Sequence, residues 1–308
     1  MSLAPPDTEI PYDRRVDAAP GELRQVSPLV RRLIAPNGGP FTFTGTCTYI
    51  VGQGRVAVID PGPEDAAHVA TLLDALEGET VETILVTHTH RDHSPASRLL
   101  QAATGARILG CAPHFSARGL APGEASPLDA SNDKNYLPGH VMADGEALQG
   151  DGYTLRALAT PGHTMNHLCF ALPQENALFS GDHVMAWSTS IVAPPDGSMA
   201  AYMASLDKLR GRSEAVYWPG HGGPVNEPQR FVRALAHHRR QREVSILNCL
   251  REGPCTVADI VARIYEALDP RLRGAAALSV FAHLEDLCGR GEARADGAVT
   301  LHALYALA

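Results

Sequence analysis

An apolar run that leads directly into a cluster of histidines constrains this 308-residue chain more than any other feature. Residues 83–87 read Thr-Ile-Leu-Val-Thr, which predicts a strand buried on both faces. Residues 88–93 follow at once and read His-Thr-His-Arg-Asp-His. Because side chains alternate along an extended chain, His88 and His90 can face the same ion. Imidazole and carboxylate are ligand types that zinc takes in proteins, so the sequence predicts a metal centre at the end of this strand.

Three shorter motifs each add one more histidine or aspartate just past a predicted strand. They are residues 161–164 (Pro-Gly-His-Thr), 180–182 (Ser-Gly-Asp) and 219–222 (Pro-Gly-His-Gly). Loops that leave the ends of neighbouring strands can converge on one pocket. Asp92 and His93 lie where the chain turns into a helix, so they can face a second ion. We expect the first ion to take His88, His90, His163 and Asp182, and the second to take Asp92, His93, His221 and Asp182, with Asp182 as the bridge.

A site of this kind predicts hydrolysis. Two divalent ions, which we expect to be zinc, lower the pKa of a bridging water toward neutrality, and the resulting hydroxide attacks a carbonyl carbon or a phosphorus. Asp92 is the residue that we expect to orient this hydroxide. Four residues are candidates for substrate contacts, because three of them follow Asp182 and one lies in a long loop at residues 119–139: His183, Trp187, Ser188 and Tyr136.

The pattern of the chain changes near residue 228. Before it, short β-branched runs alternate with helical patterns, and strands are predicted at 41–51, 55–59, 83–87, 107–109, 154–158, 167–172, 177–179 and 215–218. After it, helices are predicted at 228–250, 256–268 and 275–288, with a hairpin at 292–301 around Asp296-Gly297. Residues 237–240 (His-His-Arg-Arg) are expected on a solvated helix face. We predict an extended arm at 1–20, a catalytic domain at 21–227 and a winged-helix-like domain at 228–308.

The net charge of −8 is unevenly distributed along the chain. Residues 1–227 contain 15 basic and 25 acidic side chains, and residues 228–308 contain 11 and 9. Neither part has the clear basic excess that is typical of a polyanion binder, which favours a small-molecule substrate. Six scattered cysteines without a Cys-x-x-Cys pair indicate buried thiols in a reducing compartment. Without a signal sequence or an apolar run of about 20 residues, we expect a cytoplasmic protein that does not enter the membrane.

The four motifs together resemble the signature of the metallo-β-lactamase superfamily, in which His-x-His-x-Asp-His precedes distant His, Asp and His ligands. The resemblance covers residues 20–228 and implies an α/β fold, a four-layer αββα sandwich with the metals at one edge between two sheets. Asp60, in Ile-Asp-Pro-Gly, matches a family aspartate that orients a ligand histidine instead of binding metal. Antibiotic-cleaving enzymes of the best-known subgroup have cysteine at the position of Asp182, which disfavours β-lactam hydrolysis here.

The order of the two predicted domains is similar to that of the lactamase-β-2-like subfamily, which includes a single-strand endoribonuclease and fungal acyl-carrier-protein thioesterases. The resemblance implies hydrolysis of a small ester, thioester or lactone, and the alternative is cleavage of single-stranded RNA or another phosphodiester. A mononuclear iron sulfur dioxygenase on the same scaffold is a second alternative. A DNA-binding role would need arginines on the helix at 275–288, which has none, so we expect the C-terminal domain to pack beside the pocket or to form a homodimer.

Overall fold

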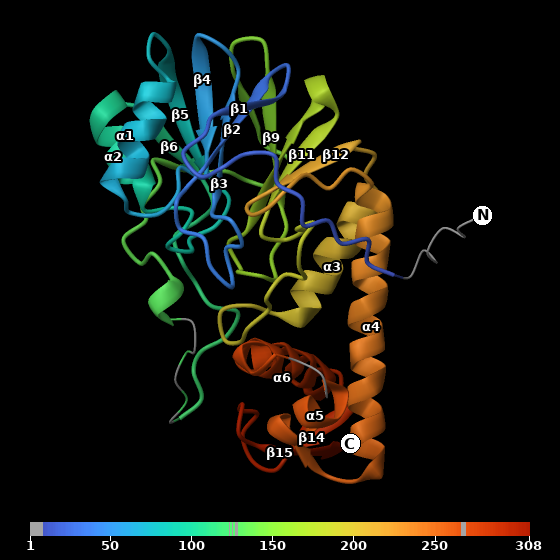
Figure 1. Cartoon of the computed structure of the whole chain (residues 1–308). Coiled ribbons are helices and arrows are strands. Elements are labelled where there is room, and N and C mark those ends of the chain that lie inside the picture. The colour runs from blue at the N-terminus through green and yellow to red at the C-terminus, as the bar shows by residue number, and fades with distance from the viewer. Residues whose placement is uncertain (1–8, 123, 125, 127–128, 266–268) are drawn as a thin grey trace, which may run out of the picture.

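Two β-sheets packed face to face form the centre of the molecule (Figure 1). The computed structural model describes residues 9–122, 124, 126, 129–265 and 269–308. In the first sheet the strands lie in chain order: β1 (Arg24–Ser27), β2 (Val30–Ile34), β3 (Cys47–Val51), β4 (Arg55–Ile59), β5 (Thr80–Val86), β6 (Arg107–Gly110) and β7 (His140–Val141). In the second sheet the order is β12 (Val216–Pro219), β11 (Ala177–Gly181), β10 (Leu168–Leu172), β9 (Thr154–Ala159) and β8 (Ala147–Gln149).

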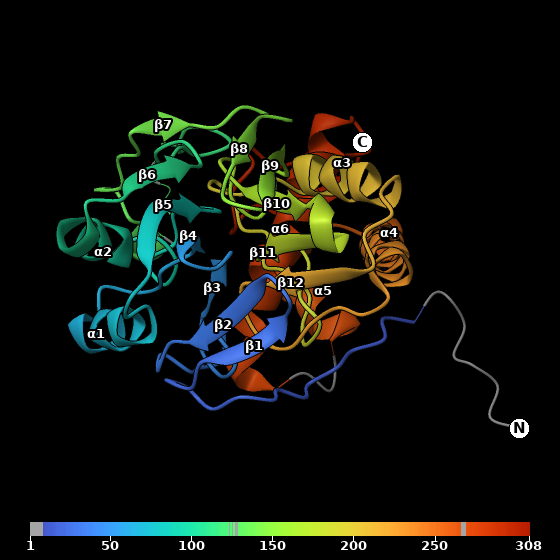
Figure 2. The ribbon, with the colours of Figure 1, turned by 90° about the horizontal axis from the view of Figure 1, so that it is seen from above.

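Helices cover the outer face of each sheet, which gives four layers (Figures 1 and 2). Helices α1 (Ala66–Ala75) and α2 (Ala96–Thr104) lie on the first sheet and connect β4, β5 and β6, which pair in parallel. Helices α3 (Met199–Arg210) and α4 (Pro228–Glu252) lie on the second sheet. Parallel strands joined by helices bring their carboxyl ends to one edge of the sheet, so the residues after β5 reach that edge. The expected αββα sandwich is confirmed.

The space between the two sheets is filled by apolar side chains from both. Tyr49 of β3 and Phe179 of β11 face each other with ring centroids 5.1 Å apart, and Phe170 of β10 is fully buried beside them. A second apolar cluster lies between the outer face of the second sheet and its helices, where Leu178 of β11 packs with Leu206 of α3. Burying both faces of the second sheet explains why β10 and β11 read as continuous apolar runs instead of alternating ones.

The C-terminal unit is a winged helix, as predicted. It contains the second half of α4, then β13 (Cys255–Thr256), α5 (Val257–Ile264), α6 (Arg273–Gly289), β14 (Ala293–Ala295) and β15 (Leu304–Leu307). Its three strands form a sheet of order β13-β15-β14. Helix α4 contributes to both units, because Phe231 packs on the second sheet and Ile246 packs in the C-terminal core. Because α4 packs on both units, the domain boundary predicted at residue 227 stays a prediction. Short 3-10 turns complete the fold: η1 (Asp129–Ser131), η2 (Pro173–Glu175) and η3 (Pro270–Leu272).

Two local predictions were wrong. The expected strand at 41–51 begins only at Cys47, because Phe43 adopts a left-handed backbone conformation and the preceding residues form turns. The expected two-residue turn at Asp296-Gly297 is a loop of residues 296–303, since Ala295 pairs with Tyr305. Tyr305 is fully buried in the C-terminal core, and that burial sets the register of the hairpin. None of the helices in the described residues is both long and apolar enough to span a membrane.

Candidate metal centre

The predicted ligands come from four loops that meet at one edge of the sandwich. The first six-residue motif directly follows β5 in the first sheet. In the second sheet, His163 follows β9, Asp182 follows β11 and His221 follows β12. Pairing of Leu168 with Ala159 and of Phe170 with Phe179 shows that β9 and β11 end at the same edge. The two sheets therefore present their loops to a common point, as the spacing of the motifs predicts.

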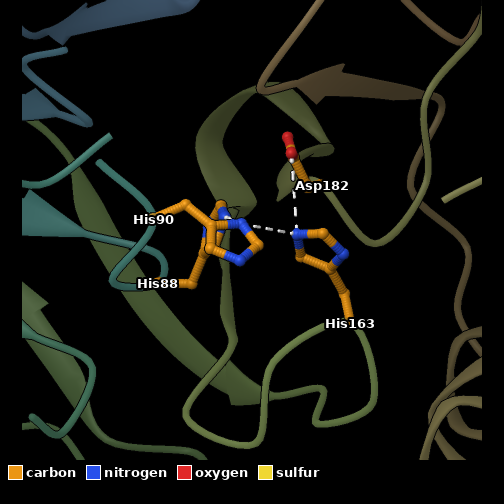
Figure 3. A group of neighbouring side chains, drawn as sticks. All are labelled: His88, His90, His163 and Asp182. Atoms are coloured by element: carbon orange, nitrogen blue, oxygen red, sulfur yellow. Dashed lines mark hydrogen bonds and ion pairs between the residues drawn. The ribbon is translucent and has the colours of Figure 1, made fainter. Parts of the chain in front are cut away.

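Four of these side chains form the first group (Figure 3). The Nδ1 atom of His90 lies 3.0 Å from Nε2 of His88 and 3.0 Å from Nε2 of His163. One carboxylate oxygen of Asp182, Oδ2, lies 3.7 Å from Nε2 of His163. All four side chains are buried, and their ligand atoms lie within 4.8 Å of one another. Three imidazoles and a carboxylate around one point match the donor set of a zinc or similar divalent ion.

A second group lies beside the first and consists of Asp92, His93 and His221. The Oδ2 atom of Asp92 is 3.1 Å from Nε2 of His221 and 3.4 Å from Nε2 of His93. Asp182 also faces this group, with Oδ2 3.4 Å from Nε2 of His221 and Oδ1 3.5 Å from Nε2 of His93. The Asp182 carboxylate thus lies between the two groups, which is the position that a bridging ligand needs.

Each histidine that presents Nε2 to the cluster forms a hydrogen bond through its other ring nitrogen, Nδ1. His163 Nδ1 donates to the carbonyl oxygen of Ile191 at 2.6 Å, and His221 Nδ1 donates to that of Gly45 at 3.2 Å. His88 Nδ1 lies 3.0 Å from the Thr87 hydroxyl. Such hydrogen bonds fix the tautomer and leave the inner nitrogen with a lone pair. The inner nitrogens therefore face one another as acceptors.

Asp60 is the acceptor that orients the remaining histidine. Its Oδ2 atom lies 2.9 Å from Nδ1 of His93 and accepts the Thr87 hydroxyl at 2.7 Å, while Oδ1 accepts the Thr87 backbone N–H at 2.8 Å. Because the Thr87 hydroxyl donates to Asp60, its lone pairs accept the proton of His88. Ligand atoms of Asp60, His88 and His93 also lie within 4.8 Å of one another, close enough to hold a metal ion. We favour the orienting role, because both oxygens of Asp60 are already occupied and Nε2 of His93 faces Asp92 and Asp182.

The residues present fit bound cations. Nitrogen lone pairs at 3.0–3.3 Å from one another repel unless a proton or a metal ion lies between them. The Oδ1 atom of Asp182 is buried and has no hydrogen-bond partner among the residues that the structure describes, which is costly for a carboxylate oxygen. Burial alone would lower the pKa of His221, but the carboxylates of Asp182 and Asp92 raise it to about 10. By contrast, burial together with His163 lowers the pKa of His90 to about 3. The side of the cluster around His221 thus attracts positive charge, whereas the side around His90 offers neutral imidazole ligands.

Glycine 220 lets the loops approach this closely. A Cβ atom at Gly220 would lie 2.4 Å from Oδ1 of Asp182 and 2.7 Å from Cε1 of His93, so no side chain fits there. Gly181, just before Asp182, has φ of +49°, a conformation that glycine adopts at low cost. The Pro-Gly-His and Ser-Gly-Asp motifs therefore contain glycine for steric reasons, and each glycine serves to place the ligand that follows it.

A cavity of about 560 Å³ opens over the cluster. Five of the cluster residues line it together with aromatic and aliphatic side chains: His90, Asp92, His163, Asp182, His221, Tyr12, Phe41, Met185, Trp187, Ile191 and Leu272. Trp187 and Ser188, both predicted to contact substrate, belong to the lining, and Trp187 stacks on Phe43 at 4.9 Å. This volume lies in the range of about 300–1,000 Å³ that is usual for small-molecule sites.

Two predicted substrate contacts lie elsewhere. Tyr136 is 2% exposed and packs in the apolar core of the two sheets, so it does not line the cavity. His183 is fully buried and packs against the Tyr202 ring at 4.5 Å, also outside the lining. Of the described residues of the 119–139 loop, only Ser131 reaches the cavity. A sequence can place these residues near Asp182 or in a loop, but it does not show which way they point.

The structure also brings residues to the cavity that sequence reasoning missed. The cavity is also lined by His238 and Arg239 of α4 and by Tyr265. The expectation of a solvated face at 237–240 was therefore wrong for His238 and Arg239. The signal was present in the sequence. Arg239 follows Leu235 and Phe231 at steps of four, which places it on the buried stripe of the helix. The predicted packing of the C-terminal unit beside the pocket is confirmed.

Comparisons with known proteins agree with this site. Residues 41–221 match the model of the metallo-beta-lactamase superfamily, and residues 256–300 match that of the beta-lactamase associated winged helix domain. A beta-lactamase-like protein 2 homolog of Drosophila melanogaster is 31% identical over 274 residues, which cover 86% of this chain and 89% of that protein. An atrochrysone carboxyl ACP thioesterase of Aspergillus terreus is 31% identical over 273 residues, which cover 82% and 77%.

A solved structure supports the same architecture. A beta-lactamase domain protein from Burkholderia ambifaria aligns with a TM-score of 0.79 at 22% identity, over 96% of this chain and 97% of the other. The sandwich with a histidine and aspartate cluster at its edge defines a class of metal-dependent hydrolases. The chain belongs to the metallo-beta-lactamase superfamily, and its C-terminal unit is the winged-helix domain associated with that superfamily. It is a metal-dependent hydrolase.

Proposed function

We propose that this chain hydrolyses a small ester, thioester or lactone at a centre of two divalent metal ions, with a thioester as the first candidate. One observation carries the proposal: the Asp182 carboxylate faces both ligand groups at the base of a largely apolar cavity. A shared carboxylate is the arrangement that two-metal hydrolytic sites use. Two relatives that match over most of the chain are named as acyl-carrier-protein thioesterases, which supports a thioester.

The proposed ligand sets are those predicted from the sequence. His88, His90, His163 and Asp182 would hold one ion, and Asp92, His93, His221 and Asp182 would hold the other, with zinc as the expected metal. Bound ions would supply a water of lowered pKa that they share, and a Lewis acid for the scissile carbonyl. Asp60 holds the ring of His93 through its Nδ1 atom, so that the lone pair on Nε2 stays directed inward.

The chain's own residues would bind and orient the reactants. Asp92 is 26% exposed at its side chain and lines the cavity, so its carboxylate can accept a hydrogen bond from the attacking water. Its pKa is held well below the usual range, against the effect of burial, by His93 and His221, so it is ionised at neutral pH. Trp187 and Ser188 form part of the wall against which the acyl group would lie.

The test is a substrate panel on protein of measured metal content. We expect two zinc ions per chain and hydrolysis of thioesters above that of lactones, of bis-p-nitrophenyl phosphate and of single-stranded RNA. Asp92→Ala should retain one ion and lose roughly 100-fold or more in kcat, as is usual for a positioned acid–base group. Glu77→Ala, an exposed position in the turn that follows α1, is the control for a lost carboxylate.

Other outcomes would assign the site differently. One iron per chain with oxygen-dependent turnover of a persulfide would support the sulfur dioxygenase alternative. Faster cleavage of RNA than of any thioester would support the phosphodiesterase alternative. Full turnover by the Asp92→Ala variant would reject the two-metal scheme.

A further inference from the structure

Helix α4, which joins the two units, places a buried cation in the wall of the cavity. Arg239 of α4 is 3% exposed, and it lines the same cavity as the metal cluster. An arginine stays charged at any physiological pH, and burying that charge is costly unless it is paired. Within the residues that the structure describes, Arg239 forms no ion pair with a carboxylate. A buried, unneutralised cation in a substrate cavity is a feature that requires an explanation.

Neutral groups hold the guanidinium of Arg239 in place. One Nη atom donates to the carbonyl oxygen of Ser190, and the other donates to the hydroxyl of Ser279 at 3.0 Å. The guanidinium carbon lies 5.1 Å from the centroid of the Tyr202 ring. The Nε atom of Arg239 is buried, and none of the described residues forms a hydrogen bond with it. These contacts fix the position of the group and leave donor capacity unused, but they do not balance its charge.

The neighbouring side chains add no negative charge. His238 also lines the cavity, and its buried Nδ1 atom has no hydrogen-bond partner in the described part of the chain. Burial, with the nearby charges of Arg239 and Arg242, lowers the pKa of His238 to about 4, so its ring is neutral at pH 7. The carboxylates that do line the cavity, Asp92 and Asp182, belong to the metal cluster. This end of the cavity is therefore electropositive.

The remaining lining limits the kind of ligand. Much of it is aromatic or aliphatic, including Phe41, Trp187, Leu272 and Ala276. A ligand that matches the cavity has an apolar body, a bond placed at the metal cluster and one anionic group. A carboxylate suits the planar fork of arginine, because two parallel N–H bonds can form to its two oxygens.

We propose that Arg239, with His238 beside it, forms a subsite for a carboxylate that the substrate carries apart from the hydrolysed bond. The inference rests on the proposed function and specifies its substrate class as ω-carboxyacyl thioesters or esters. The subsite makes the C-terminal unit a determinant of specificity, because α4 supplies the cation and Ser279 of α6 holds it.

Matched pairs of substrates test the proposal. The N-acetylcysteamine thioesters of glutarate through azelate are compared with thioesters of monocarboxylic acids of equal length. At the best length, we expect a kcat/KM ratio of carboxylated to neutral substrate of about 10 or more, mainly through KM, because a hydrogen bond to a charged group is worth this much. In Arg239→Met the ratio should fall to about 1. Arg240→Met, an exposed neighbour on the same helix, should leave the ratio unchanged.

Arg239→Lys provides a second variant in case the methionine variant does not fold. It keeps the charge but loses the planar fork, so the ratio should fall at least about threefold while the melting temperature stays near that of the parent. An equal loss for carboxylated and neutral substrates in a folded variant would show that Arg239 is only structural. A larger loss for bis-p-nitrophenyl phosphate would assign the subsite to phosphodiesters. Either result would overturn the proposal.

A binding measurement separates this inference from the proposed function. Calorimetric titration of the metal-loaded protein with suberate and with octanoate compares an ω-carboxylate with a methyl group at the same length and needs no hydrolysis. We expect suberate to bind about 10-fold more tightly than octanoate to the parent chain, and equally to Arg239→Met. This result without any thioester turnover would keep the subsite and reject the hydrolytic proposal. Equal binding by the parent chain would reject the subsite.

Discussion

At the scale of single residues, the site depends on which nitrogen of each histidine faces inward. Four rings are tied at Nδ1 and present Nε2, whereas His90 presents Nδ1 to the cluster. The acceptors that tie them are diverse: backbone carbonyls, a hydroxyl and the Asp60 carboxylate. Of these, only Asp60 is a side chain with a charge, and it holds both Thr87 and His93. Its replacement is therefore the sharpest test of how the rings are oriented.

Substituting Asp60→Asn keeps the size of the side chain and removes its charge. An amide can place its N–H₂ against Nδ1 of His93, which favours the tautomer whose Nε2 carries the proton and cannot bind metal. We expect affinity for the more weakly held ion to fall about 10- to 100-fold. Competition with a chelator measures this affinity, and Asp74→Asn on the exposed face of α1 is the control. Unchanged affinity in a folded Asp60→Asn variant would show that Asp60 does not orient the ligand.

Substituting Gly220→Ala tests the close approach of the loops. The added methyl would lie 2.4 Å from Oδ1 of Asp182, so this carboxylate must move. Because a displacement of about 1 Å in a catalytic group can cost 10²-fold, we expect turnover to fall about 100-fold and at least one ion to be lost. Metal content per chain and kcat are the measurements. Gly274→Ala, where a methyl meets no atom within 4 Å, should keep both values.

At the scale of elements, a strand or helix could be predicted from the sequence where its pattern of apolar residues matches the residues that are buried. The apolar run at residues 83–87 predicted β5 well, since the residues of this strand from Thr83 to Val86 are all buried. Strands β1 and β2 were not predicted, because they carry charged residues such as Arg31 and Arg32 between the apolar ones. Arg32 is fully buried and forms an ion pair with Asp17, a tertiary contact that no local pattern indicates.

The members of the histidine and aspartate cluster were easier to predict from the sequence than the residues that line the cavity. Each candidate ligand is a histidine or an aspartate that follows a strand, so its residue type and its position both indicate it. Contacts in the cavity depend on how the C-terminal unit packs on the sandwich. Arg239 shows this, because its burial follows from α6 lying against α4. Tyr136 shows the reverse, since a residue of a long loop became part of the core.

The start of α5 offers a prediction about a single element. Thr256 caps this helix, and it exchanges hydrogen bonds with Asp259 in a capping box. Thr256→Ala removes the cap, which should lower the free energy of unfolding by about 1 kcal/mol. Urea denaturation measures the change. Thr71→Ala, where the hydroxyl bonds only to the carbonyl of Ala67 within α1, should be neutral or stabilising. Equal losses in the two variants would contradict the capping role.

At the scale of the whole molecule, the cavity joins the two units. The sandwich supplies the metal cluster and Trp187, the connecting helix α4 supplies Arg239, and the C-terminal unit supplies residues of α6. Figure 1 shows α6 lying across the end of the sandwich beneath the loops that carry the site, with α4 as the connection. The cavity is therefore complete only when the two units pack together. Any change that weakens this packing should also affect the cavity.

A buried histidine makes this packing sensitive to acid. His283 of α6 is 2% exposed, and within residues 9–122, 124, 126, 129–265 and 269–308 neither of its ring nitrogens has a hydrogen-bond partner. Burial, with the nearby charge of Arg239, lowers its pKa to about 3. The unfolded chain binds the proton near pH 6.5 and the folded chain does not, so the contribution to stability is complete above pH 6.5 and is lost as the pH falls toward 3. Between pH 7 and pH 5 the loss from His283 amounts to about 2 kcal/mol.

Substituting His283→Phe should remove this part of the acid sensitivity. The phenyl ring is similar in size and does not titrate, so the free energy of unfolding should fall by about 2 kcal/mol less between pH 7 and pH 5 than in the parent. Urea denaturation at the two pH values measures the difference. The histidines of the metal cluster titrate in both proteins, so their contribution to the pH dependence cancels when the variant is compared with the parent. His302→Phe at an exposed position controls for the loss of a histidine as such. The same pH dependence in the parent and in His283→Phe would mean that α6 already accommodates a charged ring, and that acid acts on this molecule through the metal site instead of the packing of its two units.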